Sequence, residues 1–183
     1  MQIDYSSILN LLRQPDRQEE GFRLLMKQYG ESVYWHIRRI VVGHDDAEDV
    51  LQETAISIFK NFHQFAGEAN QLRAWIYRIA TNESIMLLRK RTRLFQSIDD
   101  LNPALLETMT TENNVDMNKA EFILQKKLLS LPTQQRIVFY MRYYDDLPYE
   151  EISRITGKKV NTLKANYHFA KTKIEEELKN QTL

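Results

Sequence analysis

The 183-residue chain contains no cysteine. This absence excludes a disulfide scaffold, a zinc–thiolate centre, an iron–sulfur cluster and a cysteine nucleophile. It suits a reducing compartment, and we expect a cytoplasmic protein. The chain also lacks any apolar run near the roughly 18 residues of a membrane span, so we expect no direct membrane insertion. The N-terminus opens acidic with interrupted apolar positions, which is not the pattern of a signal peptide.

Glycine and proline are scarce, with 5 and 4 residues. Strand-like alternation is nearly absent, whereas apolar residues recur at helical spacing along most of the chain. The hydrophobic content of 43% is enough for a packed core. The sequence therefore predicts an all-α fold. The predicted helices cover residues 6–13, 21–29, 32–42, 45–62, 72–93, 122–129, 132–144, 149–156 and 160–178.

The net charge of the chain is zero, because 25 basic side chains balance 25 acidic ones. Nucleic-acid binders typically carry a basic surplus, so the sum alone argues against one. The charges are nevertheless segregated, which indicates different partners for different surfaces. Any single run also fits an ordinary solvated helix face. The acidic cluster is Asp45, Asp46, Glu48, Asp49 and Glu53, and the basic ones are Arg89, Lys90, Arg91 and Arg93, then Lys158, Lys159, Lys164, Lys171 and Lys173.

The composition shifts to Asn, Thr, Asp and Glu between residues 97 and 120, with one proline and only a short helical patch at 101–109. This pattern predicts a flexible acidic linker. An irregular helix packed on the first half is the alternative. The linker divides the chain into two small helical domains, residues 1–96 and 121–183.

The second domain has the pattern of a helix-turn-helix. Gly157 follows one predicted helix as a stop that supplies a left-handed backbone turn. The next helix begins a few residues later, where Asn161 or Thr162 is expected to cap its free N–H groups. Four apolar side chains are placed to pin the two helices together, namely Ile152, Ile155, Val160 and Leu163.

In a helix-turn-helix the second helix enters the major groove with its N-terminal part. Asparagine pairs with adenine, and lysine reaches guanine or phosphate. The candidate DNA-contacting residues are Asn161, Thr162, Lys164, Asn166, His168 and Lys171. The alternative is a helical hairpin whose lysines are merely solvated.

The helix predicted over 72–93 carries an arginine-rich face with one asparagine, which suits a nucleic-acid backbone plus one base contact. Its members are Arg78, Asn82, Arg89 and Arg93. Trp75 shares the apolar stripe of this helix and is assigned to the core. Tyr77 fits either the core or base stacking.

The preceding helix carries an acidic and polar face, formed by Asp49, Gln52, Glu53, Ile56 and Lys60. Such a face disfavours phosphate but fits a basic partner protein, with Ile56 as a central apolar contact. A solvated face is again the alternative. His44 and its acidic neighbours offer metal ligands, but no second cluster, phosphate loop or nucleophile elbow accompanies them. We expect no enzyme, catalytic residue, metal or cofactor, and a metal-dependent helical hydrolase is the least favoured alternative.

Two sets of motifs resemble the bacterial sigma-70 family, in its short extracytoplasmic-function (ECF) group. The second conserved region of these sigma factors resembles residues 45–53, 65–68 and 72–82, and the fourth region resembles residues 131–132, 147–152 and 160–164. The two regions occur in the family's order and cover roughly residues 16–93 and 121–178. Many members carry arginine where this chain has Asn166 and Phe169.

The resemblance implies a factor that binds RNA polymerase core and directs promoter recognition, −10 melting and transcription initiation. The acidic helix would dock the polymerase clamp helices through Asp49, Gln52, Glu53 and Ile56. The −10 contacts would be Phe65, Gly67, Glu68, Arg78, Asn82 and Arg89, with a flipped base entering a pocket made by residues 65–71 and Asn82. The helix-turn-helix would read the −35 element. An anti-sigma factor is a common partner in this family, and a helix-turn-helix regulator acting without polymerase is the main alternative.

Overall fold

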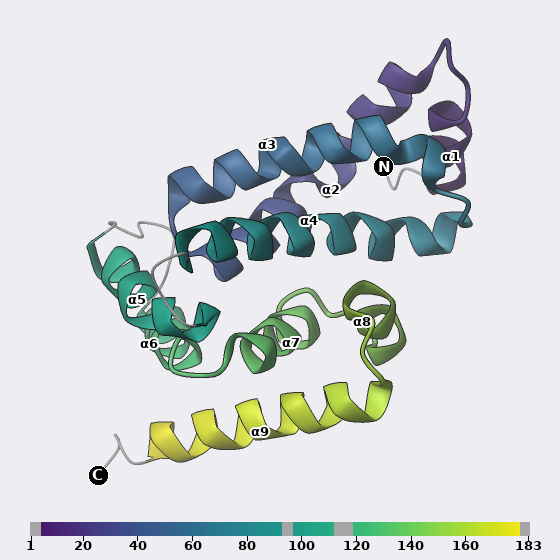
Figure 1. The fold of residues 1–183 in the computed structure, drawn as a ribbon. Coiled ribbons are helices and arrows are strands. Elements are labelled where there is room, and N and C mark those ends of the chain that lie inside the picture. Colours follow the sequence, from purple (N-terminus) through teal and green to yellow (C-terminus); the bar gives the residue numbers. More distant parts are fainter. Residues whose placement is uncertain (1–4, 93–96, 112–118, 180–183) are drawn as a thin grey trace.

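The computed structural model describes residues 5–92, 97–111 and 119–179. Within these residues the regular structure is entirely helical, so the predicted all-α class is confirmed (Figure 1). We call residues 5–92 the first half and residues 119–179 the second half. The α-helices are α1 (Tyr5–Leu12), α2 (Gln18–Val41), α3 (His44–Asn61), α4 (Ala69–Arg91), α5 (Asn102–Thr111), α6 (Lys119–Leu128), α7 (Thr133–Tyr143), α8 (Tyr149–Thr156) and α9 (Val160–Lys179). The short 3₁₀ turns are η1 (Phe62–Gln64) and η3 (Ile98–Leu101).

The first half is a bundle in which α2, α3 and α4 pack against one another and α1 packs on α2 and α4. The sequence predicted two helices at residues 21–29 and 32–42, and that prediction is wrong, because α2 is one helix of 24 residues. An interior glycine such as Gly30 costs a helix only about 1 kcal/mol. The buried stripe formed by Leu25, Tyr29, Val33 and Ile37 runs unbroken past it, so packing outweighs the propensity.

Two glycines of α2 offer a matched test of this packing. A Cβ on Gly21 would lie 2.7 Å from the backbone nitrogen of Leu12, whereas one on Gly30 would meet nothing closer than 3.9 Å. We expect Gly21→Ala to push α1 off α2 and to lower the free energy of unfolding by about 1–3 kcal/mol. Gly30→Ala should instead raise it by about 0.5–1 kcal/mol through helix propensity. Urea unfolding measures both, and equal effects would contradict the described packing.

The segment predicted as a flexible linker is ordered over residues 97–111, and the prediction is wrong there. Leu101, Leu105 and Met109 recur every fourth residue and are all buried. The segment also bonds to the second half, because the Asp99 carboxylate accepts from the Thr133 backbone N–H at 2.7 Å. The Asn102 side chain donates to the Leu131 carbonyl and accepts from Arg136. Three apolar residues and two polar anchors thus suffice to order a polar sequence. Residues 112–118 of the predicted linker lie outside the described residues.

The second half stacks α9 beneath α7 and α8, and the whole half lies along α4 (Figure 1). Contacts between the halves run from α4 to α8 and from α2 to α7. The acidic helix α3 and the C-terminal helix α9 therefore lie on opposite outer faces of the molecule (Figure 1). None of the helices in the described part of the chain is long and apolar enough to cross a membrane.

Candidate functional site

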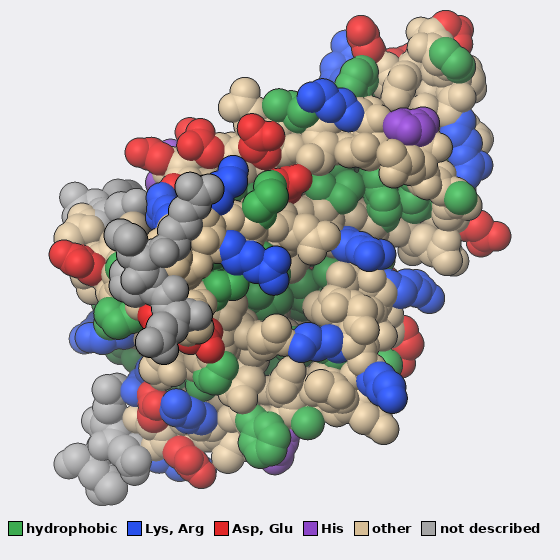
Figure 2. All heavy atoms as spheres, viewed as in Figure 1, with side chains coloured by type: hydrophobic (Ala, Val, Ile, Leu, Met, Phe, Trp, Pro, Cys, Tyr) green, Lys and Arg blue, Asp and Glu red, His purple; other side chains and the backbone are tan. Residues whose placement is uncertain are grey.

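The predicted acidic surface lies on α3. This helix buries Ala47, Val50, Thr54 and Ile58, which leaves the opposite face outward. Asp49, Gln52 and Glu53 are exposed on that face, and Ile56 is exposed beside them. Figure 2 shows acidic side chains gathered over the N-terminal half of α3, with Lys and Arg side chains along α4.

Phe59 extends this surface and was missed in the sequence, because its helical spacing groups it with the buried apolar residues of α3. The side chain is 39% exposed, close to the 38% of Ile56 one helical turn away. Its ring packs edge-on with that of Phe22 of α2, with the two centroids 5.3 Å apart. Its position between the buried and polar faces hid it, because apolar spacing alone does not say which members of a broad stripe stay exposed.

Hydrogen bonds hold the loop between α3 and α4 on both sides. The Gly67 carbonyl accepts from the Arg13 guanidinium at 3.0 Å, and the Glu68 backbone N–H donates to the Gln71 side chain in a capping box. Phe65 is buried, with its ring 5.2 Å from that of Trp75. Trp75 also contacts Phe62, so its assignment to the core is confirmed. Glu68 is exposed.

Gly67 is required by close approach rather than by its backbone angle. An added Cβ would lie 2.8 Å from the Phe65 ring and 2.7 Å from the Gln71 side-chain oxygen. Beside this loop, α1 and η1 enclose a hollow of about 330 Å³. Its lining combines aromatic rings with polar groups, namely Leu12, Arg13, Pro15, Gln18, Phe62, His63 and Phe65.

The predicted basic face of α4 is present, with Arg78, Asn82 and Arg89 all exposed. Arg93 lies outside the described residues. Asn82 lies seven residues beyond Trp75, about 10 Å along the helix axis. The aromatic residues around the α3–α4 loop and Asn82 therefore lie one after the other along α4. Their combination into one base pocket stays a prediction. Tyr77 is buried, which resolves its ambiguity in favour of the core.

The helix-turn-helix forms as predicted. Gly157 has φ 70°, the left-handed conformation expected of it. Ile152, Ile155 and Leu163 are buried and Val160 is half-buried, so the four pins hold α8 against α9.

The capping prediction is wrong. Since α9 begins at Val160, Asn161 and Thr162 lie inside its first turn rather than at the cap. The turn is closed from α8 instead, where the Ser153 hydroxyl donates to the Lys158 carbonyl at 2.7 Å. The Thr156 hydroxyl accepts from the Lys158 backbone N–H at 3.3 Å.

The outer face of α9 carries most of the predicted DNA contacts. Asn161, Thr162, Lys164, His168 and Lys171 are exposed there. Asn166 is the exception, because its side chain is partly buried. Beneath the face, Tyr149, Tyr167, Phe139 and Tyr143 form a chain of ring contacts. Burial raises the pKa of Tyr149, and the Lys164 ammonium lies 5.8 Å from its ring centre.

His44, in the histidine-acid stretch, contacts side chains of α2 and of its own helix. His44 bonds to the Tyr34 hydroxyl at 2.8 Å and lies 3.4 Å from the Glu48 carboxylate. Among the described residues, no group of three or more His, Asp or Glu side chains is arranged to hold a metal ion.

Two family models match the chain in the order of its halves. The model of Sigma-70 region 2 matches residues 25–94, and the model of Sigma-70, region 4 matches residues 121–174. The chain belongs to the ECF group of the sigma-70 family. Both regions are present, so a plain helix-turn-helix regulator is not favoured. Sigma factors are non-enzymatic transcription initiation factors.

Curated relatives match this chain over most of its length and over most of their own. The ECF RNA polymerase sigma factor SigW of Bacillus subtilis is 25% identical over 172 residues, which cover 88% of this chain and 91% of the relative. The ECF RNA polymerase sigma-E factor of Haemophilus influenzae is 26% identical over 186 residues, covering 97% and 96%.

Two solved structures share the fold. The sigma factor RpoE of Bartonella quintana, in complex with the anti-sigma factor NepR, has a TM-score of 0.67 and 20% identity over 86% of this chain and 96% of that one. CnrH in complex with the cytosolic domain of CnrY has a TM-score of 0.69 and 18% identity over 97% of both chains.

Proposed function

We propose that this sigma factor binds RNA polymerase core through α3 and positions it on promoter DNA through α4 and α9. The observation that supports this proposal is that the exposed face of α3 is acidic, whereas the exposed faces of α4 and α9 are basic. Asp49 and Glu53 lie on α3, whereas arginines line α4 and lysines line α9. Complementary charge sets partner choice and association rate, so one molecule can offer acid to a protein and base to a nucleic acid.

The polymerase-docking surface consists of Asp49, Gln52, Glu53 and Ile56, and we add Phe59. The two exposed apolar side chains stand one turn apart beside the carboxylates. This combination, an apolar centre with a charged rim, is the general anatomy of a protein interface. It supports docking on a basic, partly apolar helical surface of the polymerase.

The −10 element would be contacted by the loop and α4, through Phe65, Gly67, Glu68, Arg78, Asn82 and Arg89. Phe65 acts from within the aromatic cluster and shapes the loop, since its side chain is buried. Arg78 and Arg89 would neutralise phosphates along one face, and Asn82 between them would read a base. The hollow beside the loop offers aromatic walls to an unstacked base.

The −35 element would be read by α9, through Asn161, Thr162, Lys164, Asn166, His168 and Lys171. The N-terminal turns of α9 project outward, as direct readout in the major groove requires. Asn166 is the least accessible of the six.

Asn82→Ala is expected to change the −10 base preference without changing the −35 preference. Losing a good base contact costs about 1–3 kcal/mol of discrimination, roughly 5- to 150-fold. The measurement is transcription by core polymerase plus the variant on a promoter library. Asn10→Ala, which alters an exposed asparagine of α1, is the matched control. An unchanged −10 preference would remove Asn82 from the reading surface.

We also propose that the protein acts in the cytoplasm, where RNA polymerase is found, and that an anti-sigma factor binds it. The support for the second partner is that both solved neighbours are complexes, one of them with an anti-sigma factor by name.

A further inference from the structure

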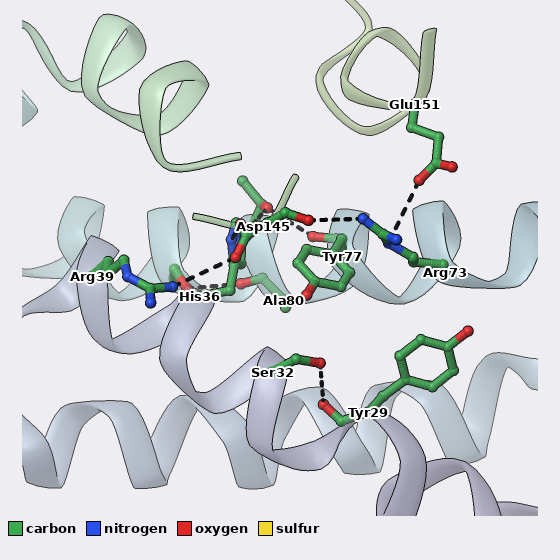
Figure 3. A network of polar contacts seen from close by, with 11 residues as sticks. Tyr29, Ser32, His36, Arg39, Arg73, Tyr77, Ala80, Asp145 and Glu151 are labelled. Atoms are coloured by element: carbon green, nitrogen blue, oxygen red, sulfur yellow. Dashed lines mark hydrogen bonds and ion pairs between the residues drawn. The ribbon is translucent and has the colours of Figure 1, made fainter. Parts of the chain in front are cut away.

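The two halves meet at a buried polar contact centred on Asp145, in the turn between α7 and α8. The His36 Nδ1 atom lies 2.6 Å from one Asp145 carboxylate oxygen, and the two side chains are 0% and 3% exposed. Arg39 lies 3.5 Å from the other oxygen. Figure 3 shows these side chains converging from α2 and from the turn. The pair joins residues 109 positions apart in the sequence.

The first half holds this contact in a fixed geometry. The Thr81 hydroxyl donates to the Tyr77 carbonyl at 2.7 Å, so it accepts from His36 Nε2, which lies 2.9 Å away. The ring of His36 is therefore anchored on α4 while its Nδ1 faces Asp145. Burial, and next the nearby Asp145 carboxylate, raise the pKa of Tyr77.

A second layer of contacts surrounds the buried pair. The Arg73 guanidinium of α4 donates to the Asp145 backbone carbonyl at 2.8 Å and lies 3.7 Å from the Glu151 carboxylate of α8 (Figure 3). The Arg39 guanidinium stacks 4.2 Å from the centre of the Tyr144 ring. Burial raises the pKa of Tyr144 to about 12. The first half thus offers His36, Arg39 and Arg73 to a single acidic turn of the second half.

This closed arrangement does not fit simultaneous binding of both promoter elements. Positions −10 and −35 are about 25 base pairs apart, which is roughly 85 Å at 3.4 Å per base pair. A compact chain of 183 residues has a radius of gyration of only about 16 Å. The halves must therefore separate before α4 and α9 reach their two elements.

We propose that the Asp145 contact is a latch, which keeps the free sigma factor closed and is released when the halves separate to span a promoter. The inference rests on the proposed function for the identity of the two DNA elements. The latch itself rests on the buried contact between the halves. The chain's own α7–α8 turn forms this contact, and it packs against the cationic surface of α2 and α4.

The absence of cysteine permits a direct test in the full chain. Lys27→Cys on α2 and Glu176→Cys on α9 place spin labels at exposed positions in the two halves. Asp145→Lys reverses the latch charge, and Asp146→Lys makes the same change one residue away, where the side chain is 91% exposed. Pulsed electron paramagnetic resonance should give one narrow distance for the parent and for Asp146→Lys. Asp145→Lys should add a broad population at longer distances, and a retained narrow distance would overturn the latch.

A second variant guards against misfolding. Arg73→Glu removes the outer contacts from a side chain that is 34% exposed, and it places a carboxylate opposite Glu151. If circular dichroism shows that Asp145→Lys has lost helix, the distance distribution of Arg73→Glu decides. A broadened distribution supports the latch, and an unchanged one rejects it.

Binding to DNA without polymerase provides the functional readout. We expect Asp145→Lys to bind DNA with a duplex −35 element and a single-stranded −10 element at least tenfold more tightly than Asp146→Lys does, because the second contact becomes intramolecular. On a duplex with only the −35 element the two variants should bind equally. Equal affinities for the two-element DNA would contradict the latch. Failure of every variant to bind either DNA would count against the proposed function, while the distance measurement still decides the latch.

Discussion

Replacing Asp49 and Glu53 by arginine is expected to abolish binding to RNA polymerase core while the fold survives. Both side chains are exposed on α3, on the face opposite its buried residues, so neither change disturbs the core of the first half. Like charges brought together at an interface cost several kcal/mol, and two reversals should weaken binding at least 100-fold. The measurement is a binding titration of labelled sigma factor with purified core polymerase.

The matched control reverses two acidic side chains elsewhere in the first half. Asp16 and Glu31 are exposed outside α3, and Asp16→Arg with Glu31→Arg changes the net charge by the same amount. The control should bind core as the parent does. Loss of binding in both double variants would show a general charge effect, and full binding by the α3 variant would reject this helix as the docking surface.

Lys164→Glu is expected to reduce affinity for a −35 duplex at least tenfold. Lys164 is exposed in the second turn of α9, where the recognition helix would enter the groove. Losing one phosphate contact lowers the slope of log affinity against log salt by about 1. Lys179→Glu makes the same change in the last turn of α9, roughly 22 Å along the axis, and should leave the affinity nearly unchanged.

The salt dependence separates this prediction from a loss of folding. Fluorescence anisotropy on a labelled duplex across a salt series gives the affinity and the slope together. Equal losses in the two lysine variants would mean that α9 contributes only general positive charge. An unchanged slope for Lys164→Glu would remove that lysine from the DNA contact.

The helix-turn-helix was predictable because its signals are local. Gly157, the pins Ile152 and Leu163, and the polar outer face of α9 lie within a short stretch, and each follows from helical spacing or turn chemistry. The acidic face of α3 was predictable for the same reason. The closing of the turn by Ser153 was not, since Asn161 carried an equally plausible capping pattern.

The contacts between the halves were not predictable from local pattern. His36 and Asp145 gain their roles only when the halves pack, and nothing in the spacing of either residue indicates the partner. Arg136 is similar, because it is fully buried and the one described hydrogen bond of its side chain goes to Asn102 of the ordered linker. Burial lowers the pKa of Arg136. Polar composition predicted flexibility in the linker, and long-range packing overrode it.

These oppositely charged surfaces account for the net charge of zero. In the proposed function, acidic residues of α3 meet a protein partner and basic residues of α4 and α9 meet DNA, and these opposite charges cancel in the sum. With no surplus of positive charge, we expect the free chain to have little general affinity for phosphate. Tight promoter binding should therefore depend on the polymerase.

Run-off transcription on a random promoter library tests the central claim most directly. Purified core polymerase with this chain should produce transcripts enriched for one −10 and one −35 sequence, and core alone should not. Adding Asp49→Arg with Glu53→Arg to the chain should remove that enrichment, whereas the Asp16→Arg, Glu31→Arg control should keep it. Identical transcripts with and without the chain would contradict the account.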